Sequence, residues 1–200
     1  MNKSRLEAFS DGVIAIIITI IVLMIDIPEG DDWAALGKVL PLFFCYAVSF
    51  LLIGMRWADH HHLLQITQAV NGKIIWANLL YLFSLSLYPV STGWVARTLF
   101  APAPTTVFAA LNLFETLSFV VLEHSIISSH DCLMIKNAVR KSKKEIVTLA
   151  LEAAAVGVSF IPQIRLGSYI LLLIMSALWI VPDLRMKRVY HNSKQKGPGD

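Results

Sequence analysis

Residues 5–12, RLEAFSDG, lead without interruption into the apolar segment VIAIIITIIVLMI at residues 13–25. Charged and polar side chains thus lie at the entrance of a segment long enough to cross a bilayer. Ionisable groups at membrane depth are costly unless they are paired or face water, and they mark functional sites. The segment also holds one polar residue, Thr19. The pattern predicts a helix that lines a functional site and does more than anchor the chain.

The composition indicates a polytopic all-α membrane protein. Hydrophobic residues make up 56% of the chain and charged residues 16%, whereas soluble domains carry about 25% charged residues. The mean hydropathy is +0.64, and the apolar residues gather in long runs. The first run is longer than the about 7–15 residues of a secretory signal, so we expect a retained helix. No nucleic-acid partner is expected.

Six membrane-spanning helices are predicted. Each approaches the ~20 residues that a rise of ~1.5 Å per residue needs to cross ~30 Å of hydrocarbon. The fifth is the weakest, because Glu152 interrupts it and Arg165 follows closely; without it, five spans would place the termini on opposite sides. The expected ranges are 8–27, 35–57, 74–96, 104–127, 145–162 and 165–183, followed by a flexible cytoplasmic tail at 186–200.

The basic residues favour the six-helix topology with both termini in the cytoplasm. Loops that stay inside carry an excess of lysine and arginine. With the N-terminus inside, all of the 17 basic residues except Lys38, Arg97 and Arg165 lie on the inner side, Arg56 among them. The first outer loop holds acidic residues instead. We therefore expect a multi-pass protein of a bacterial inner membrane.

One face of the first helix is a candidate pore lining. A period of 3.6 residues places Ile16, Thr19, Ile20 and Leu23 on that face. In several copies around an axis, these side chains would form apolar rings that gate by dewetting, with a hydroxyl that replaces part of an ion's hydration shell. The alternative is that this face packs against a neighbouring helix and that Thr19 bonds to its own backbone. Periodicity alone favours this alternative.

The histidine cluster at the end of the second span has three interpretations. Imidazoles near Asp59 suit a zinc site, although adjacent histidines on a helix point to different sides. Haem ligation is the second, and a membrane metal or haem protein is therefore one alternative function. The third is a hydrogen-bonded cluster that meets the polar start of the first helix. The residues are His60, His61 and His62, with Asn78 on the third span.

Isolated carboxylates in the later spans suggest a further alternative. Glu115 and Glu152 are proton sites, or they pair with one another or with backbone donors. The first case would indicate a proton-coupled transporter, yet no inverted repeat is visible in the two halves. Cys45 and Cys132 match neither a metal nor a disulfide framework. No catalytic motif of a hydrolase, a phosphate loop or a zinc protease is present, so we expect no enzyme and no cofactor.

The chain resembles the transmembrane protein 175 family, the endolysosomal potassium channels and their bacterial relatives. The pattern Arg5-x-x-x-Phe9-Ser10-Asp11 is similar to the signature of that family. Trp57, the histidines that follow it, Asn78 and the motif Tyr88-Pro89-Val90-x-Thr92 resemble later family features in kind and order. His62 lies outside the pattern. The animal proteins carry two six-helix repeats, so this one-repeat chain resembles a bacterial form.

The resemblance implies a homotetrameric channel whose first helix lines the central pore. Potassium is the implied permeant ion, with weak to moderate selectivity over sodium, and other monovalent cations or protons are further candidates. The implied constriction residues are Ile16, Thr19 and Leu23. The Phe-Ser-Asp motif is then structural support within a polar network of Arg5, Phe9, Ser10, Asp11, Trp57, His60, His61 and Asn78.

Overall fold

Every regular element in the described part of the chain is an α-helix. The computed structural model describes residues 2–98, 100–129, 143–161, 163–164 and 167–180. The expected tail at 186–200 and Cys132 lie outside these ranges. The helices are α1 (Lys3–Val22), α2 (Trp33–Ile66), α3 (Gly72–Ser86), α4 (Tyr88–Arg97), α5 (Pro102–Ser129), α7 (Lys143–Ser159) and α8 (Gly167–Ile180).

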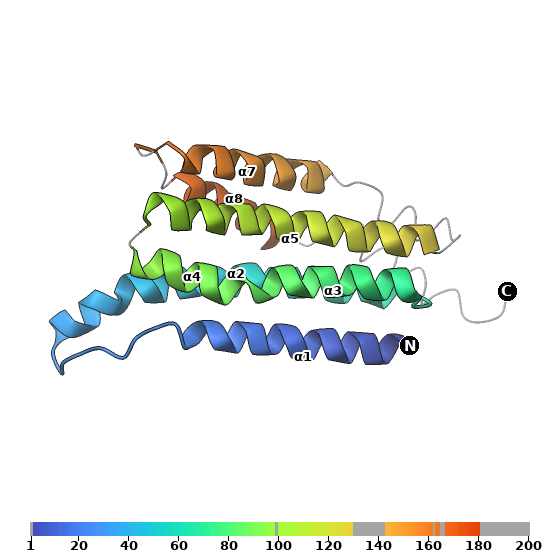
Figure 1. Cartoon of the computed structure of the whole chain (residues 1–200), viewed down its shortest axis with the longest axis horizontal. Coiled ribbons are helices and arrows are strands. Elements are labelled where there is room, and N and C mark those ends of the chain that lie inside the picture. The colour runs from blue at the N-terminus through green and yellow to red at the C-terminus, as the bar shows by residue number, and fades with distance from the viewer. Residues whose placement is uncertain (1, 99, 130–142, 162, 165–166, 181–200) are drawn as a thin grey trace.

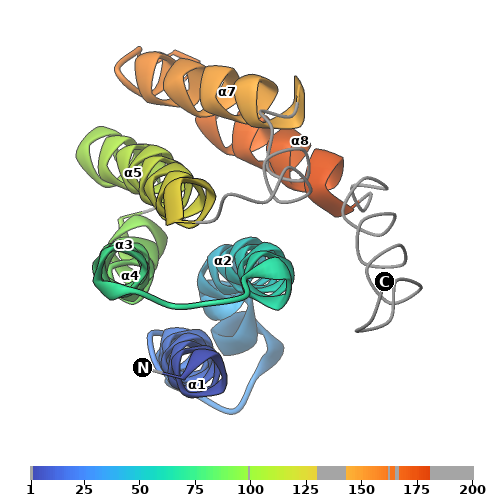
Figure 2. The same ribbon diagram turned by 90° about the vertical axis from the view of Figure 1, so that its right-hand side faces the viewer.

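The helices form a bundle in which α1 lies at one edge. They run roughly along the long axis of the molecule (Figure 1). Seen end-on, α1 is followed by α2 and the α3–α4 pair, then by α5, and α7 and α8 lie on the far side (Figure 2). α1 packs on α2, α3 and α4, and α5 connects this group to α7. One side of α1 is therefore left without a neighbour from the described part of its own chain.

Side-chain caps fix where three helices begin. The side chains of Asn2, Asp32 and Asn71 accept hydrogen bonds from the backbone N–H groups of Ser4, Ala35 and Ile74. Such caps satisfy N–H groups that have no partner inside the helix. α1, α2 and α3 therefore begin before the expected starts at 8, 35 and 74.

The ends of α1 and α2 also differ from the expected ends. α1 ends at Val22, because the following residues Leu23, Met24 and Ile25 make tighter bonds to carbonyls three residues back. Residues 26–27 follow this turn. α2 continues past 57 to Ile66, so the histidines lie inside it.

The third expected span is two helices. α3 ends at Ser86 and α4 begins at Tyr88, with Leu87 between them. Pro89 has no N–H to continue the α3 hydrogen-bond ladder, but it fits the first turn of α4, where that N–H needs no partner inside the helix. α5 agrees closely with the expected range 104–127, and α7 and α8 overlap 145–162 and 165–183.

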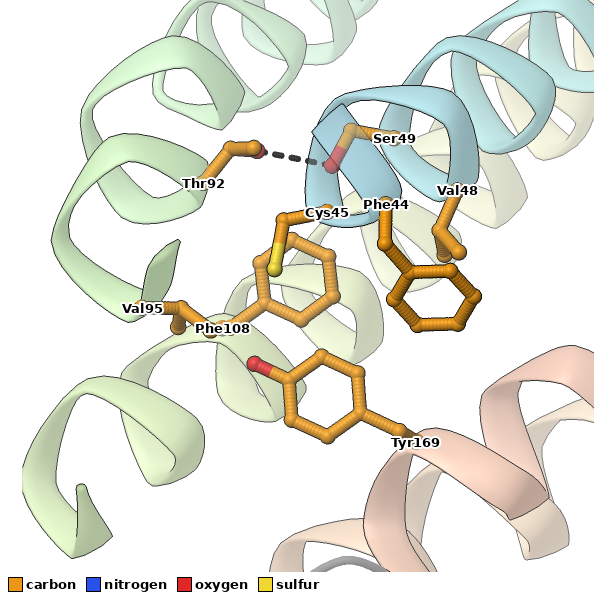
Figure 3. A pocket seen from close by; sticks show the side chains of 8 residues that line it. All are labelled: Phe44, Cys45, Val48, Ser49, Thr92, Val95, Phe108 and Tyr169. Carbon is orange, nitrogen blue, oxygen red and sulfur yellow. Dashed lines mark hydrogen bonds between the residues drawn. The ribbon is translucent and has the colours of Figure 1, made fainter. Parts of the chain in front are cut away.

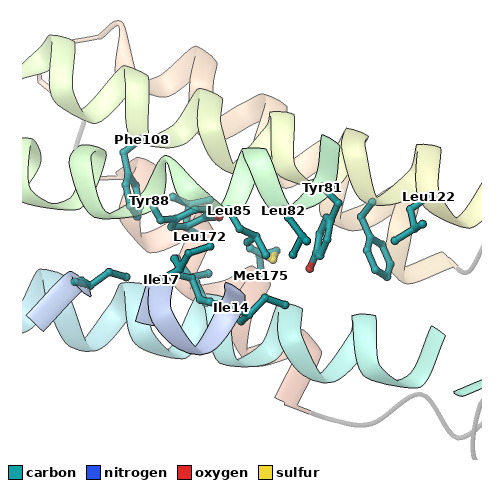
Figure 4. Packing of buried hydrophobic residues seen from close by; sticks show 14 of the residues in the cluster. Ile14, Ile17, Tyr81, Leu82, Leu85, Tyr88, Phe108, Leu122, Leu172 and Met175 are labelled. Carbon is teal, nitrogen blue, oxygen red and sulfur yellow. The ribbon is translucent and has the colours of Figure 1, made fainter. Parts of the chain in front are cut away.

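Within the described residues, three helical stretches are long and apolar enough to cross a membrane by length and composition: Trp33–Ile66, Gly72–Arg97 and Pro102–Ser129. α1 has 20 residues, but Arg5, Glu7 and Asp11 lie in its first turns. The apolar core runs between the layers as one cluster (Figure 4). Its two largest fully buried members are Tyr81 and Tyr88, whose hydroxyls donate to Arg56 O and Asn112 Oδ1 at 3.0 and 2.8 Å.

Candidate pore helix and its polar support

The two faces of α1 differ sharply in burial. The face toward α2, α3 and α4 is made of Leu6, Ser10, Ile14, Ile17 and Ile21, all buried. The opposite face contains the residues that the periodicity singled out. Ile16 is 59% exposed, Leu23 is 75% exposed, and Thr19 and Ile20 are exposed as well. We call Ile16, Thr19, Ile20 and Leu23 the α1 stripe; Leu23 lies at the helix end as its C-cap.

Small residues extend the uncovered face toward the start of α1. Gly12 and Ala15 are exposed, and a Cβ atom added at Gly12 would meet nothing within 4 Å. Thr19 Oγ1 donates to its own backbone, at 3.1 Å from Ala15 O and 2.9 Å from Ile16 O. The hydroxyl proton is thereby used, and the oxygen lone pairs remain available to a group outside the helix.

A chain of hydrogen bonds fixes the buried face of α1. His60 Nε2 lies 2.7 Å from Asn78 Oδ1. Asn78 Nδ2 donates to Ser10 Oγ at 2.9 Å, and Ser10 Oγ donates to Leu6 O at 2.9 Å. Because the Asn78 amide nitrogen serves Ser10, its oxygen is the acceptor, so His60 carries its proton on Nε2. The chain crosses from α2 through α3 to α1.

A second contact joins α2 to the Phe-Ser-Asp motif. Trp57 Nε1 donates to Asp11 Oδ1 at 2.8 Å, and the Trp57 ring stacks on His61 with centroids 5.6 Å apart. His61 in turn bonds Gln65 at 2.8 Å, with Glu7 Oε1 at 3.6 Å from its Nδ1. These contacts surround the first turns of α1.

The residues that form polar contacts around α1 are not all those that the sequence predicted for the network. The side chains of Arg5 and Phe9 are exposed, and the Arg5 guanidinium makes no hydrogen bond or ion pair with the described part of the chain. Lys3 takes the place that was expected for Arg5, because its Nζ donates to Gln65 O at 2.8 Å. Glu7 and Gln65 were missed. Their helical spacing from Asp11 and from His61 was the available signal.

A buried ionic cluster lies deeper in the bundle. Arg56 Nε is 2.7 Å from Glu115 Oε2, and Arg56 Nη2 is 2.8 Å from Glu152 Oε1. We call Arg56, Glu115 and Glu152 the ionic cluster. The sequence placed Arg56 at the cytoplasmic end of the second span, and this placement was wrong for the side chain. The guanidinium is buried because carboxylates from α5 and α7 compensate its charge.

Comparisons with known proteins agree with this geometry. The protein-family model described as endosomal/lysosomal potassium channel TMEM175 matches residues 5–89 of this chain. A potassium channel of Chryseobacterium sp. (strain P1-3) is 40% identical over 190 residues, which cover 94% of this chain and 97% of the relative. The chain belongs to the TMEM175 family.

Two more distant TMEM175 relatives match in structure and in sequence, respectively. A crystal structure of a lysosomal potassium-selective channel TMEM175 homolog from Chamaesiphon minutus superposes with a TM-score of 0.75 at 25% identity, covering 92% of this chain and 97% of that one. The human endosomal/lysosomal proton channel TMEM175 is 34% identical over 113 residues, 48% of this chain and 22% of the human protein.

Residues 5–89, which the TMEM175 family model matches, contain the α1 stripe and the residues of α2 and α3 that form hydrogen bonds with α1. Both carboxylates of the ionic cluster, Glu115 and Glu152, lie beyond residue 89. Each side chain is 0% exposed. Both carboxylates are therefore buried within the single chain.

The three histidines do not converge on a metal position. The His60 ring stacks on Tyr81 with centroids 5.2 Å apart, His61 faces Glu7 and Gln65, and His62 is exposed. Within the described residues of this TMEM175 chain, no group of three or more His, Cys, Asp or Glu side chains is arranged to hold a metal ion.

A small pocket lies between α2, α4, α5 and α8, away from α1 (Figure 3). Its volume is about 10 Å³, which is near the lower limit for one water molecule. The Cys45 thiol lies in it, free and buried. The lining residues are Phe44, Cys45, Val48, Ser49, Thr92, Val95, Phe108 and Tyr169, with Ser49 bonded to Thr92 at 2.8 Å.

Proposed function

We propose that this TMEM175 chain is the subunit of a homotetrameric, potassium-permeable channel of a bacterial inner membrane, with both termini in the cytoplasm. Four copies of α1 surround the pore, and each presents its α1 stripe to the axis. Potassium moves passively through this path. The potassium channels of Chryseobacterium and the potassium-selective homolog of Chamaesiphon, by their names, support this choice of ion.

The observation that carries the proposal is the uncovered α1 stripe. Exposed apolar side chains occur elsewhere on the chain, where lipid accounts for them, and many of these are large aromatics such as Trp76 and Phe83. From Gly12 onward the uncovered face of α1 holds no aromatic residue. Glycine, alanine, threonine and branched aliphatics allow helices to approach one another closely. This composition favours contact between copies of α1 over contact with lipid.

The stripe supplies both a barrier and a polar contact for an ion. Ile16 and Leu23 lie about 10 Å apart along a helix axis at ~1.5 Å per residue. Rings of these side chains, with Ile20 between them, exclude water where the pore is narrow. The Thr19 hydroxyl donates to its own backbone, so it offers lone pairs to a passing cation. Dehydration at the rings and coordination by Thr19 then set selectivity.

The hydrogen bonds from α2 and α3 hold α1 in the rotation that this role requires. Ser10 and Asp11 are tied to Asn78 and Trp57. Any rotation of α1 that turned the stripe toward lipid would break these bonds and leave buried polar groups without partners.

The test is potassium flux through the full chain reconstituted in liposomes under a potassium gradient. We expect flux in the wild type and faster flux in Ile16→Asn and Leu23→Asn, because a polar ring lowers the dewetting barrier. Leu51→Asn on α2 is the matched control, since Leu51 is 55% exposed but lies on another helix; its flux should equal that of the wild type. Absence of flux, or flux that neither α1 variant changes, would contradict the proposal.

A further inference from the structure

The ionic cluster joins three helices through charged side chains at their centres. Arg56 comes from α2, Glu115 from α5 and Glu152 from α7, and the side chains are 6%, 0% and 0% exposed. The hydroxyl of Thr116 lies among them. Arg56 Nη2 donates to Thr116 Oγ1 at 2.7 Å, and Thr116 Oγ1 donates to Glu152 Oε1 at 2.8 Å.

The formal charges of this cluster do not balance. The Arg56 guanidinium stays protonated in proteins, so two ionised carboxylates would leave one uncompensated negative charge. Among the described residues, the other ionisable groups whose charges reach the cluster are Asp59 on α2 and the hydroxyls of Tyr81 and Tyr88. None of these is a cation. An uncompensated charge buried among apolar helices is costly, and a carboxylate in that position takes up a proton instead.

The hydrogen bonds distinguish the two carboxylates. Glu152 Oε1 accepts from both Arg56 Nη2 and Thr116 Oγ1, and such donors stabilise an ionised carboxylate. Glu115 Oε2 lies 2.7 Å from Arg56 Nε, and the nearby Tyr81 hydroxyl donates to Arg56 O. One oxygen of each carboxylate, Glu115 Oε1 and Glu152 Oε2, is buried without a hydrogen-bond partner among the described residues. Glu115 is therefore the carboxylate with the weaker support for a negative charge.

We propose that Arg56, Glu115 and Glu152 form a buried proton-binding site in which one proton resides on Glu115. The proton comes from the aqueous phase and converts the Glu115 carboxylate into a carboxylic acid; no other bond changes. Glu152 stays ionised against Arg56, and the cluster is neutral. This neutral cluster clamps α5 and α7 to α2. The proposal does not depend on how α1 is used.

Infrared spectroscopy of the full chain in liposomes at neutral pH counts the protonated carboxyl groups directly. Their C=O stretch is separate from that of carboxylates. We expect one such group in the wild type and none in Glu115→Gln or Glu152→Gln, because one carboxylate then faces one guanidinium. Arg56→Gln should give about twice the wild-type intensity, since both carboxyl groups become neutral. The two isosteric glutamine variants decide the proposal even if Arg56→Gln does not fold.

Two controls and one further pair of variants complete the test. Asp59→Asn and Glu123→Gln should retain the band. Glu115→Asp should shift its frequency, whereas Glu152→Asp should leave it in place. A wild-type spectrum without the band, a band that survives Glu115→Gln, or a band that disappears only in Glu123→Gln would overturn the proposal. A shift in Glu152→Asp alone would overturn the placement of the proton on Glu115.

Discussion

At the residue scale, Asn78 on α3 is the side chain that links α1 to α2 through hydrogen bonds. Its amide accepts from His60 and donates to Ser10, and all three side chains are 0% exposed. A buried polar group that loses its partner keeps the full cost of its desolvation. Asn78 thus connects three helices through two buried hydrogen bonds.

Replacement of Asn78 by leucine should destabilise the protein. Asn78→Leu removes both hydrogen bonds and leaves the His60 Nε2 proton without an acceptor, so we expect a loss of about 1–3 kcal/mol. Thermal unfolding of the purified protein in detergent measures this. Gln68→Leu is the control, because Gln68 is an exposed polar residue outside any helix, and its unfolding temperature should stay near that of the wild type. Equal unfolding temperatures for all three proteins would contradict this role of Asn78.

The sequence suggested which residues belong to the polar network around α1, but it did not indicate which atoms form hydrogen bonds with one another. Ser10, Asp11, Trp57, His60 and Asn78 were all expected in one network, and their contacts link α1, α2 and α3. Which atoms pair depends on how each helix is rotated, and no spacing within one helix contains that information. For the same reason the sequence offered Arg5, where the structure uses Lys3.

At the element scale, caps and charge compensation decide where the helices begin and end. The Asp32 side chain accepts the Ala35 N–H at 2.7 Å and so starts α2. α2 ends at Ile66, well beyond Arg56. Hydropathy alone would place the end of the membrane span near Arg56. Glu115 and Glu152 compensate the charge of the buried Arg56. These partners are far away in sequence, so the sequence could not reveal that the Arg56 side chain is buried.

The Asp32 cap provides a test at this scale. Asp32→Ala removes the acceptor for the Ala35 N–H, and loss of an aspartate N-cap costs about 1 kcal/mol. Asp31→Ala is the matched control, because Asp31 is the exposed neighbour that does not cap the helix. Thermal unfolding should show a lower midpoint for Asp32→Ala only. Equal midpoints for the two variants would show that the cap does not stabilise α2.

At the scale of the whole molecule, the position of α1 at the edge of the bundle leaves its stripe uncovered by the described part of its own chain. The all-helical fold and the family followed from composition and from the motif at residues 5–12, and the TMEM175 comparisons confirm the family. The number of copies and the orientation in the membrane stay predictions, because one chain contains neither a partner nor a bilayer.

Disulfide cross-linking between subunits tests the central claim most directly. Ile16→Cys and Leu23→Cys would be made in a background of Cys45→Ala and Cys132→Ser, with Phe83→Cys, 56% exposed on α3, as the control. A disulfide needs Cα atoms about 4.4–6.8 Å apart, a distance that neighbouring stripes reach only where they meet around a narrow axis. Mild oxidation in membranes should convert the two α1 variants into covalent dimers and leave Phe83→Cys monomeric. Monomeric α1 variants alongside a cross-linked Phe83→Cys would contradict the account.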